Sequence, residues 1–565
     1  MLRNVMSLLD RKDKGKLIIL FLLDMGSMAV SLLSIAVIVP YIFILFDPSE
    51  AAAYPIFRYI AVFLPKENSL HYLLAASGVV LALYALVCLY RLFYDYVSTA
   101  VMLRMMQKYS RYLLKWYLNR PYEYYFSNHS ADIIHRYSVA ALNLLNGIVV
   151  AAMELAAQVL TLILLSVLLI GMHRTVILIP VFVISILCLT LYELTKGRLQ
   201  GYAVELNKIG RRVSIKLQES LRAITELRMA GKTDMAYRWQ VKGQEESYRI
   251  HVKRNLLMNA PNALVDFFTL VMILAVLLIS YGITGDIKEG MVVLSVSVSA
   301  ALQIRDTVMG IFGSLNEVRS NAGSYDEVFE EMKQATEEAR KADKHETAVP
   351  SFEESLELKN ISYTYPGTDT EVISSLDLKI EKGSILGISG VSGAGKTTLA
   401  QLILGLLKPG KGEVMLDRKA VDTAEDGYGR LFGYVPQEIV LLDMSIEQNV
   451  ALEDDPEKID RDRVNKALEM ACLLDFVSTL PDRAGTMTGE NGVRLSGGQR
   501  QRLGIARAIY SGAKVLVFDE ATSALDEETQ SDFLETVNAL KGSYTVIIIA
   551  HRASALKYCD RVFEV

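Results

Sequence analysis

The sequence is poor in the residues that would build a disulfide framework or a metal site. Its 565 residues include 4 cysteines and 7 histidines. The cysteines, at positions 88, 188, 472 and 559, lack the Cys-x-x-Cys spacing of zinc and redox sites. The net charge of -5 is also modest and gives no reason to expect nucleic acid as a partner.

Hydrophobic residues are abundant and unevenly distributed. They make up 51% of the chain, and the mean hydropathy is +0.27, which is too apolar for an ordinary soluble protein. Long apolar runs fill residues 1–316, whereas residues 317–350 are acidic, rich in Ala, Glu and Lys, and helical in pattern. Residues 351–565 alternate apolar, charged and Gly-rich segments. We therefore expect a helical transmembrane domain, a linker and a soluble α/β domain over these three ranges.

Six apolar stretches are long enough to cross roughly 30 Å of hydrocarbon as helices. They lie near 17–46, 72–98, 141–171, 175–195, 262–284 and 290–316. The segment Lys196–Arg254 carries fourteen Lys and Arg, whereas the loops between spans one and two, three and four, and five and six carry few. The positive-inside rule then predicts that both termini and the soluble domain lie in the cytoplasm.

A glycine-rich loop between a strand pattern and a helix pattern predicts a nucleotide phosphate site. Residues 390–397, Gly-Val-Ser-Gly-Ala-Gly-Lys-Thr, match G-x-x-x-x-G-K-[ST]. Glycines let backbone N–H groups wrap phosphate, Lys396 neutralises charge, and the Thr397 hydroxyl is suited to Mg²⁺. The residues expected to contact the nucleotide are Gly390, Ser392, Gly393, Gly395, Lys396, Thr397 and Thr398.

Two adjacent carboxylates end a second buried-strand pattern, Val515-Leu-Val-Phe-Asp-Glu520. Asp519 is placed to hold Mg²⁺ through water, and Glu520 is placed to polarise an attacking water. A strand ending in two solvated acids would show the same pattern. The phosphate loop upstream favours the catalytic interpretation.

The most specific motif in the chain is Leu495-Ser-Gly-Gly-Gln-Arg500. Its glycines precede a helix pattern and form another potential anion-binding N-terminus. The motif resembles the signature of ABC-type ATPases and stands between the phosphate loop and the paired acids, as in that family. The resemblance implies that ATP is closed between the phosphate loop of one chain and the signature residues of a second chain, here Ser496, Gly497, Gly498 and Gln499.

Four further residues match ABC elements in the family's order. The resemblance implies that Tyr365 stacks on adenine, although a Tyr before a Pro could equally be a strand end. It also implies that Gln437 senses Mg²⁺ and couples to the membrane helices, that Asp526 lies on the loop that crosses the dimer interface, and that His551 contacts the γ-phosphate. Mg²⁺ is then expected near Thr397, Gln437 and Asp519, with Glu520, His551 and Gln437 as the catalytic set.

The segment Thr486–Gly492 resembles the exporter-specific loop that contacts intracellular helices, with Glu490 as the charged contact. Met487 and Thr488 depart from the usual pattern of that loop. The resemblance to ABC exporter half-subunits covers nearly the whole chain. It implies an ATP hydrolase coupled to transport, in which cytoplasmic turns near 126–132 and 221–232 contact the ATPase domain.

A dimer is implied because one chain supplies one phosphate loop and one signature, and a composite site takes these from two copies. Both parts look intact in this sequence, so a homodimer is the simpler expectation.

Ionisable residues in the spans are candidates for substrate binding, because burying a charge in a bilayer costs a few kcal/mol unless it is paired or faces a cavity. They are Asp24, Arg91, Asp95, Glu154, Asp266, Arg305 and Asp306. Arg91 and Arg305 either line a cavity that receives an anionic headgroup or form ion pairs with neighbouring carboxylates.

The layout is similar to that of the lipid-linked oligosaccharide flippases of bacterial protein glycosylation. The likeness lies in the charged start at Leu8–Lys14, the amphipathic outer stretch at 54–64, and an Arg in each of spans two and six. It implies a lipid-linked oligosaccharide or another amphipathic lipid as substrate, in a bacterial inner membrane. A multidrug or general lipid exporter and a membrane-anchored regulatory ATPase without transport remain alternatives.

Overall fold

The structure is a computed structural model. It describes residues 2–46, 69–171, 178–284, 287–341, 348–391, 393–424, 426–520, 530–531, 534–535, 537–538 and 540–565. The chain forms two compact units. The first consists of Met1–Asn119 and Asn128–Ala342, and the second of Arg120–Ser127 and Asp343–Val565. The first unit thus takes up most of the predicted linker, and a short segment from the helical half belongs to the second.

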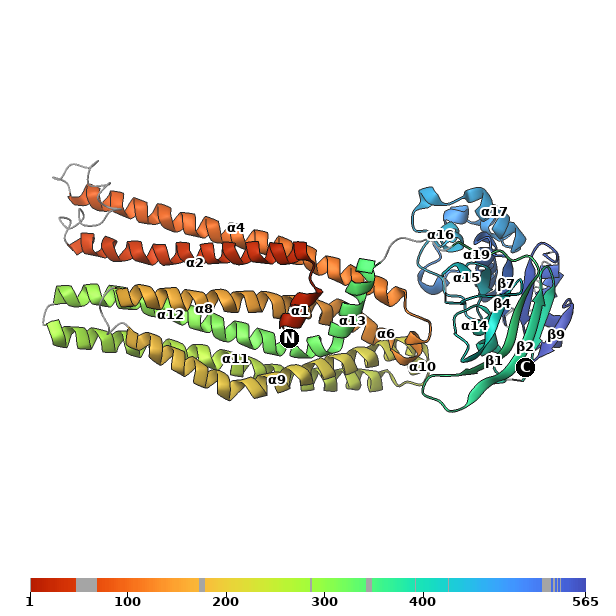
Figure 1. Cartoon of the computed structure of the whole chain (residues 1–565), viewed down its shortest axis with the longest axis horizontal. Helices are drawn as coiled ribbons and strands as arrows, with labels where there is room; N and C mark the ends of the chain where they lie inside the picture. Colours follow the sequence, from red (N-terminus) through yellow and green to blue (C-terminus); the bar gives the residue numbers. More distant parts are fainter. Residues whose placement is uncertain are drawn as a thin grey trace. The chain divides into compact units, whose positions relative to one another are not determined.

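The first unit is entirely helical where it is described, and its long helices run side by side (Figure 1). The helices are α1 (Leu2–Leu8), α2 (Arg11–Phe46), α4 (Ser69–Leu118), α6 (Ser130–His135), α7 (Ala141–Leu144), α8 (Ala151–Gly171), α9 (Leu178–Arg222), α10 (Ile224–Met229), α11 (Thr233–Thr284), α12 (Ile287–Ser320) and α13 (Ala322–Lys341). Two π-helical turns, η2 (Arg136–Ala140) and η3 (Leu145–Val150), flank α7.

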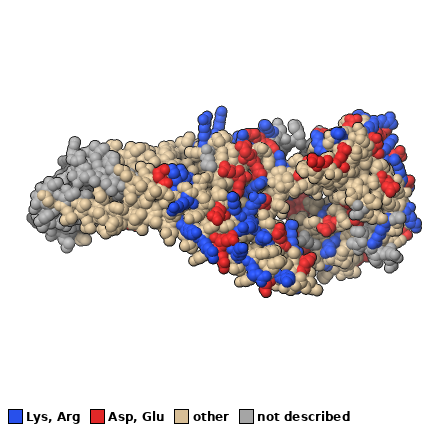
Figure 2. All heavy atoms as spheres, turned by 90° about the horizontal axis from the view of Figure 1, so that it is seen from below, with Lys and Arg blue, Asp and Glu red and all other residues tan. Residues whose placement is uncertain are grey.

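Three helical stretches in the described part of the chain are long and apolar enough to cross a membrane. They are Ser77–Leu118, Ser130–Val167 and Thr233–Ala275, and they overlap the second, third and fifth predicted spans. Helices α2, α9 and α12 run through the other three predicted spans, where many side chains lie outside the described residues. The count of six therefore stays a prediction. On the face shown in Figure 2, a zone of the helical unit with few charged side chains adjoins a zone dense in charges of both signs.

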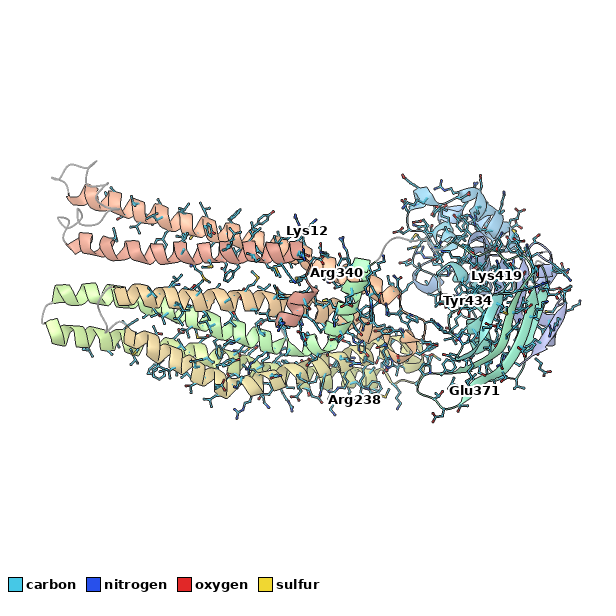
Figure 3. The ribbon with its side chains drawn as sticks, viewed as in Figure 1. Lys12, Arg238, Arg340, Glu371, Lys419 and Tyr434 are labelled. Carbon is cyan, nitrogen blue, oxygen red and sulfur yellow. The ribbon has the colours of Figure 1, made fainter. Side chains whose placement is uncertain are left out.

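The end of the helical unit that carries its N-terminus is held by ion pairs. Lys108 of α4 bonds to Asp10 and Asp13, the latter at 2.7 Å. Arg340, labelled in Figure 3, donates to Asp10 at 2.9 Å and to the Leu8 carbonyl at 2.6 Å. Helix α13 is amphipathic and buries Val328, Phe329 and Met332. It is therefore a packed part of this unit.

The second unit combines two sheets with helices on either side. The described elements are α5 (Tyr124–Ser127), β1 (Ser355–Thr364), β2 (Glu371–Glu381), β3 (Ile385–Ser389), α14 (Lys396–Ile403), β4 (Lys411–Leu416), β5 (Lys419–Ala420), α15 (Asp426–Gly429), β6 (Phe432–Val435), α16 (Ile446–Ala451), η5 (Pro456–Lys458), α17 (Arg461–Met470), α18 (Leu474–Thr479), η6 (Arg483–Gly485), η7 (Glu490–Gly492), α19 (Gly497–Tyr510), β7 (Val515–Asp519), β8 (Thr545–Ile549), η8 (Ala553–Leu556) and β9 (Arg561–Glu564).

The larger sheet positions the site. Its order is β6-β7-β8-β3-β9, and all its strands are parallel. Strands β7 and β8 are buried at every position, which explains their continuous apolar sequences. The smaller sheet, β2-β1-β4-β5, is antiparallel. Because parallel strands have their carboxyl ends at one edge, the residues that follow β3, β6, β7 and β8 come together there.

Candidate nucleotide site and membrane cavity

The phosphate loop lies between β3 and α14, as predicted. Gly390, Gly393 and Gly395 have φ of 154°, 83° and 98°, a region that a side chain rarely adopts, so this loop path requires glycine. Gly395 is the N-cap of α14, whose first residue is Lys396. Lys396 is 5% exposed, and its ammonium donates to the carbonyls of Gly390 at 3.0 Å and Val391 at 2.8 Å. The lysine therefore points back into its own loop.

Glu520 is held by two side chains from neighbouring strand ends. Its Oε2 accepts a hydrogen bond from Gln437 Nε2 at 2.8 Å, and its Oε1 lies 2.7 Å from His551 Nε2. Gln437 follows β6, Glu520 follows β7, and His551 follows β8, so adjacent parallel strands bring the three together. The structure thus brings together residues that are distant in the sequence, because Gln437 and His551 are separated by 114 positions.

The backbone at Glu520 is strained in a way that aims its side chain. Its φ is 49°, in the left-handed region that costs an ordinary residue about 1–3 kcal/mol. The Glu520 N–H donates to the Ile549 carbonyl at 3.0 Å, which holds this conformation against β8. Strain of this kind is concentrated at functional sites. It turns the carboxylate out of β7 toward Gln437 and His551.

Asp519 has a partner that the sequence did not reveal. The Tyr434 hydroxyl, on β6, donates to Asp519 Oδ2 at 3.1 Å (Tyr434 is labelled in Figure 3). Burial raises the pKa of the Asp519 carboxyl, the Tyr434 hydrogen bond opposes this, and the nearby Glu520 charge adds to it. Burial also raises the pKa of Tyr434, so its hydroxyl stays protonated as a donor.

These residues fit ATP and Mg²⁺. The loop supplies glycine backbone and a buried ammonium for phosphate, and Asp519 is a buried carboxylate that a divalent cation would stabilise in its charged form. Thr397 is exposed beside Lys396, so its hydroxyl is open to a ligand. The predicted contacts Ser392 and Asp526 lie outside the described residues.

Tyr365 lies beside the phosphate loop. Its hydroxyl is 3.0 Å from the Thr398 hydroxyl, and its ring packs edge-on against Tyr363 and Phe126, with centroids 5.1 and 5.7 Å away. Tyr363 in turn donates to Glu123 at 3.0 Å. The segment Arg120–Ser127, which belongs to the second unit, thus touches the strand that carries the predicted adenine contact.

The signature residues begin α19. Ser496 is its N-cap, and a capping box joins the Ser496 and Gln499 side chains to each other's backbone N–H. Gly497 and Gly498 form the first turn, and nothing lies within 4 Å of a Cβ added at Gly497. The helix therefore presents an open, glycine-lined N-terminus.

Thr488, a departure from the exporter-loop pattern, is a buried structural residue. It is 1% exposed, and its hydroxyl bonds to the carbonyls of Leu442 and Met444, each at 3.0 Å. Fully buried Asn449 contacts it at 3.3 Å and also bonds to Arg507 of α19 at 3.1 Å. Residues 442–449, the exporter-like loop and the signature helix therefore share one hydrogen-bond network.

The membrane arginines lie in different surroundings. Arg91 lines a cavity of about 380 Å³ in the helical unit, together with Asp24, Asp95 and Asp306. Arg305 bonds to Asp266 and, at 2.8 Å, to Asp306, and it does not line that cavity.

The second predicted cytoplasmic turn is α10, whose Met229 is 86% exposed.

Comparisons with known proteins agree with this geometry. The ABC transporter family model matches residues 373–523. A bacterial Atm1-family ABC exporter with ATP bound superimposes with a TM-score of 0.75 at 19% identity, covering 98% of this chain and 94% of that one. The chain has the fold of an ABC exporter, a helical membrane domain fused to an ABC ATPase domain. This confirms the family resemblance predicted from the sequence.

Curated relatives match little more than a third of the chain. The ATP-dependent lipid A-core flippase of Ralstonia nicotianae is 41% identical over 209 residues, 37% of this chain and 35% of the relative. A leukotoxin translocation ATP-binding protein of Mannheimia glucosida is 38% identical over 216 residues, 38% of this chain and 30% of the relative. The chain thus matches about a third of the length of each.

Proposed function

We propose that this chain is one half of an ATP-driven exporter or flippase, which works as a homodimer and moves a lipid-linked oligosaccharide or another amphipathic lipid. The observation that carries the proposal is the Gln437–Glu520–His551 cluster at the sheet edge that also holds the phosphate loop. The cluster hydrolyses ATP, and the membrane domain of the ABC exporter fold uses the free energy of hydrolysis to move the substrate.

The site's own side chains divide the chemistry among them. Glu520 accepts a proton from the attacking water, because its carboxylate lies at the strand edge and both its oxygens are oriented by neighbours. Gln437 and His551 hold that carboxylate in place. Lys396 releases its two loop carbonyls and turns its ammonium to phosphate, while Asp519 anchors the metal side of the site.

The open N-terminus of α19 supports the proposed dimer. Its glycine-lined first turn is an anion site, and the composite arrangement of the family would place a second chain's phosphate loop against it. Two identical chains satisfy this with one symmetric interface.

Movement of an amphipathic substrate is supported by the polar cavity of the helical unit. Side chains of four helices face it, at positions inside the predicted spans. A multidrug exporter would be served better by an apolar cavity, and a regulatory ATPase needs no cavity at all. The residues proposed to contact substrate remain Arg91, from the cavity wall, and Arg305, which its carboxylate partners hold near that wall through Asp306.

The test is ATPase activity of the full-length protein in lipid nanodiscs, with and without a polyprenyl-pyrophosphate oligosaccharide. Stimulation that is lost in Arg91→Ala and Arg305→Ala supports the proposal. Lys196→Ala is the matched control, because this partly exposed cation pairs with Glu193 on its own helix. Stimulation by hydrophobic drugs alone would favour a multidrug exporter, and turnover indifferent to every lipid and drug would favour a regulatory ATPase.

A further inference from the structure

The cavity of the helical unit is polar although it lies among predicted membrane spans. It has a volume of about 380 Å³ and is bounded by α2, α4, α8 and α12. Nearly every lining side chain carries a polar group, and Met28 is the apolar exception among the described residues that face it. A space of this size accommodates a small headgroup. A polar wall in this setting is costly unless it serves a ligand or water.

The charges around the cavity do not balance. Asp24, Asp95 and Asp306 face it, and Arg91 is the cation among the described lining residues. Asp306 is shared with Arg305, which also binds Asp266. Including both of these neighbours gives four carboxylates against two guanidinium groups, so the excess of two negative charges remains. A purely anionic headgroup would meet this excess as repulsion, whereas a cationic group would relieve it.

The walls are built to keep the carboxylates in place. The Tyr94 hydroxyl donates a hydrogen bond to Asp24, linking α4 to α2. Thr161 of α8 and Thr307 of α12 are 2% and 1% exposed, and each hydroxyl bonds to a carbonyl one turn earlier on its own helix, at 2.9 and 2.8 Å. The two threonine hydroxyls thus donate to carbonyls of their own helices and not to the carboxylates of the cavity.

The depth of the cavity suits a lipid headgroup. Asp24 lies seven residues inside the predicted span 17–46, and Arg91 lies seven residues before the end of the predicted span 72–98. Seven helical residues correspond to about 10 Å. In the predicted topology both positions are reached from the cytoplasmic face, where inner-leaflet headgroups reside.

We propose that the Asp24–Asp95–Asp306 cavity binds the protonated amine of a lipid headgroup, and that the cargo is a phosphorylated lipid that carries such an amine. Asp24 and Asp95 accept hydrogen bonds from the ammonium group, and Arg91, on the same helix as Asp95, lies one helical turn away on the side of the phosphate. This rests on the transport part of the proposed function and narrows its substrate to the second class named there, an amphipathic lipid other than a lipid-linked oligosaccharide.

The first experiment measures binding to the full-length protein in uncharged maltoside micelles. The probes are dihexanoyl phosphatidylethanolamine and its N-acetyl derivative, which keeps the phosphate and loses the ammonium charge. Calorimetry should show about tenfold tighter binding of the amine-bearing lipid. Equal affinity of the wild-type protein for the two lipids would overturn the inference, whatever the variants do.

Two variants locate the effect. Asp24→Asn and Asp95→Asn should each bring the two affinities within about twofold of each other while ATP binding stays at the wild-type level. Glu193→Gln, which removes an exposed carboxylate of α9 outside the cavity, should keep the tenfold difference. If both cavity variants keep it as well, the ammonium binds elsewhere and the assignment of the cavity is wrong.

A second experiment separates this inference from the proposed function. The protein is reconstituted in vesicles, and ATP-driven movement of the two lipids, labelled on an acyl chain, is followed across the bilayer. Selective binding without ATP-driven movement would leave the amine site standing and contradict the transport proposal. Equal ATP-driven movement of both lipids would support transport and overturn the amine inference.

Discussion

The two units of this chain hold the carboxylates of their proposed sites in different ways. In the second unit, Glu520 is fixed by side chains that follow adjacent strands of one sheet, at 2.7 and 2.8 Å. In the helical unit, Asp24, Asp95 and Asp306 come from three separate helices around a cavity. A parallel sheet sets its strand ends rigidly, whereas a cavity between helices changes shape when the helices move. We therefore expect the chemistry at Glu520 to be the same with any lipid, and the cavity to determine which lipid is bound.

The largest effect is expected for Glu520→Gln. Removing the base should lower ATP hydrolysis by about 10²–10⁴-fold, equally with and without lipid, because the loss lies in the proton transfer itself. ATP binding should persist, since Lys396 and the glycine loop are untouched, and the closed dimer should accumulate. Steady-state turnover and retained radiolabelled ATP measure the two effects.

Glu469→Gln, an exposed carboxylate of α17, is the control and should hydrolyse ATP normally. Robust turnover by the Glu520 variant would remove Glu520 from the catalytic role. A loss that appears only in the presence of lipid would break the distinction between the two units.

The next largest effect should be on the stability of the ATPase domain, in Asn449→Leu. This side chain is fully buried, and its amide bonds to the Leu442 carbonyl at 2.9 Å, the Leu442 N–H at 3.0 Å and Arg507 at 3.1 Å. Leucine would leave the Leu442 N–H without its acceptor and would remove one hydrogen bond each from the Leu442 carbonyl and from Arg507, at a cost of about 2–4 kcal/mol. Hydrogen exchange in α16 and α19 should rise accordingly.

Asn465→Leu, at an exposed position of α17, is the matched substitution and should change exchange little. Unaltered protection of α16 in the Asn449 variant would mean that the network does not hold the signature helix to its neighbours.

A smaller effect is expected for Tyr434→Phe, which removes the hydroxyl that bonds to Asp519 and keeps the ring. Loss of one hydrogen bond to a carboxylate is worth about 1.5–3 kcal/mol, and because this bond favours the charged form, its loss raises the pKa of Asp519 further and lets a proton compete with the cation. We expect a roughly threefold to tenfold higher Mg²⁺ concentration for half-maximal turnover, with maximal turnover nearly unchanged.

Tyr510→Phe is the control. It removes a hydroxyl that accepts a hydrogen bond from the Asp460 N–H at 3.3 Å and that is not a partner of Asp519. An unchanged Mg²⁺ requirement in Tyr434→Phe would show that Tyr434 does not position Asp519.

The smallest effect concerns pH and Asp560. Hydrogen bonds from the Ile385 N–H, at 2.9 Å, and from Lys541 lower the pKa of this carboxyl below its usual value. A lowered pKa stabilises the fold above the unfolded-state value, near pH 4, and the contribution is lost as pH falls through the folded-state pKa. Asp560→Asn should therefore lower the melting temperature slightly at neutral pH and flatten its decline below about pH 4. A parallel pH profile in variant and wild type would contradict this.

Much of the nucleotide site could be predicted from the sequence. Lys396, Glu520 and His551 were identified by motif, and the structure places them at one sheet edge. Tyr434 was missed, because a tyrosine in a strand is commonly a packing residue and its hydroxyl contact depends on which strand lies next to β6. Its position three residues before Gln437 was the available signal.

The cavity shows the opposite case. Its charged residues were all noticed as ionisable positions in predicted spans, yet the sequence assigned them to an anion site or to local ion pairs. Asp95 follows Arg91 by one turn, and Asp306 follows Arg305 directly, so both are natural partners along the chain. Only the packing of α2 against α4 and of α8 against α12 shows that the acids outnumber the arginines around one space.

The sequence by itself determined the chemistry of the ATPase half, because glycine loops, a buried lysine and paired carboxylates act through local backbone geometry that a short motif encodes. It also predicted a membrane half, because hydrophobic length is a property of continuous segments. The tertiary structure decided which strand ends meet at Glu520, that Thr488 and Asn449 tie the signature helix to its neighbours, and that four helices enclose an acidic cavity. These features depend on contacts between residues that are distant in the chain. A local sequence pattern does not contain the charges and volumes of such contacts.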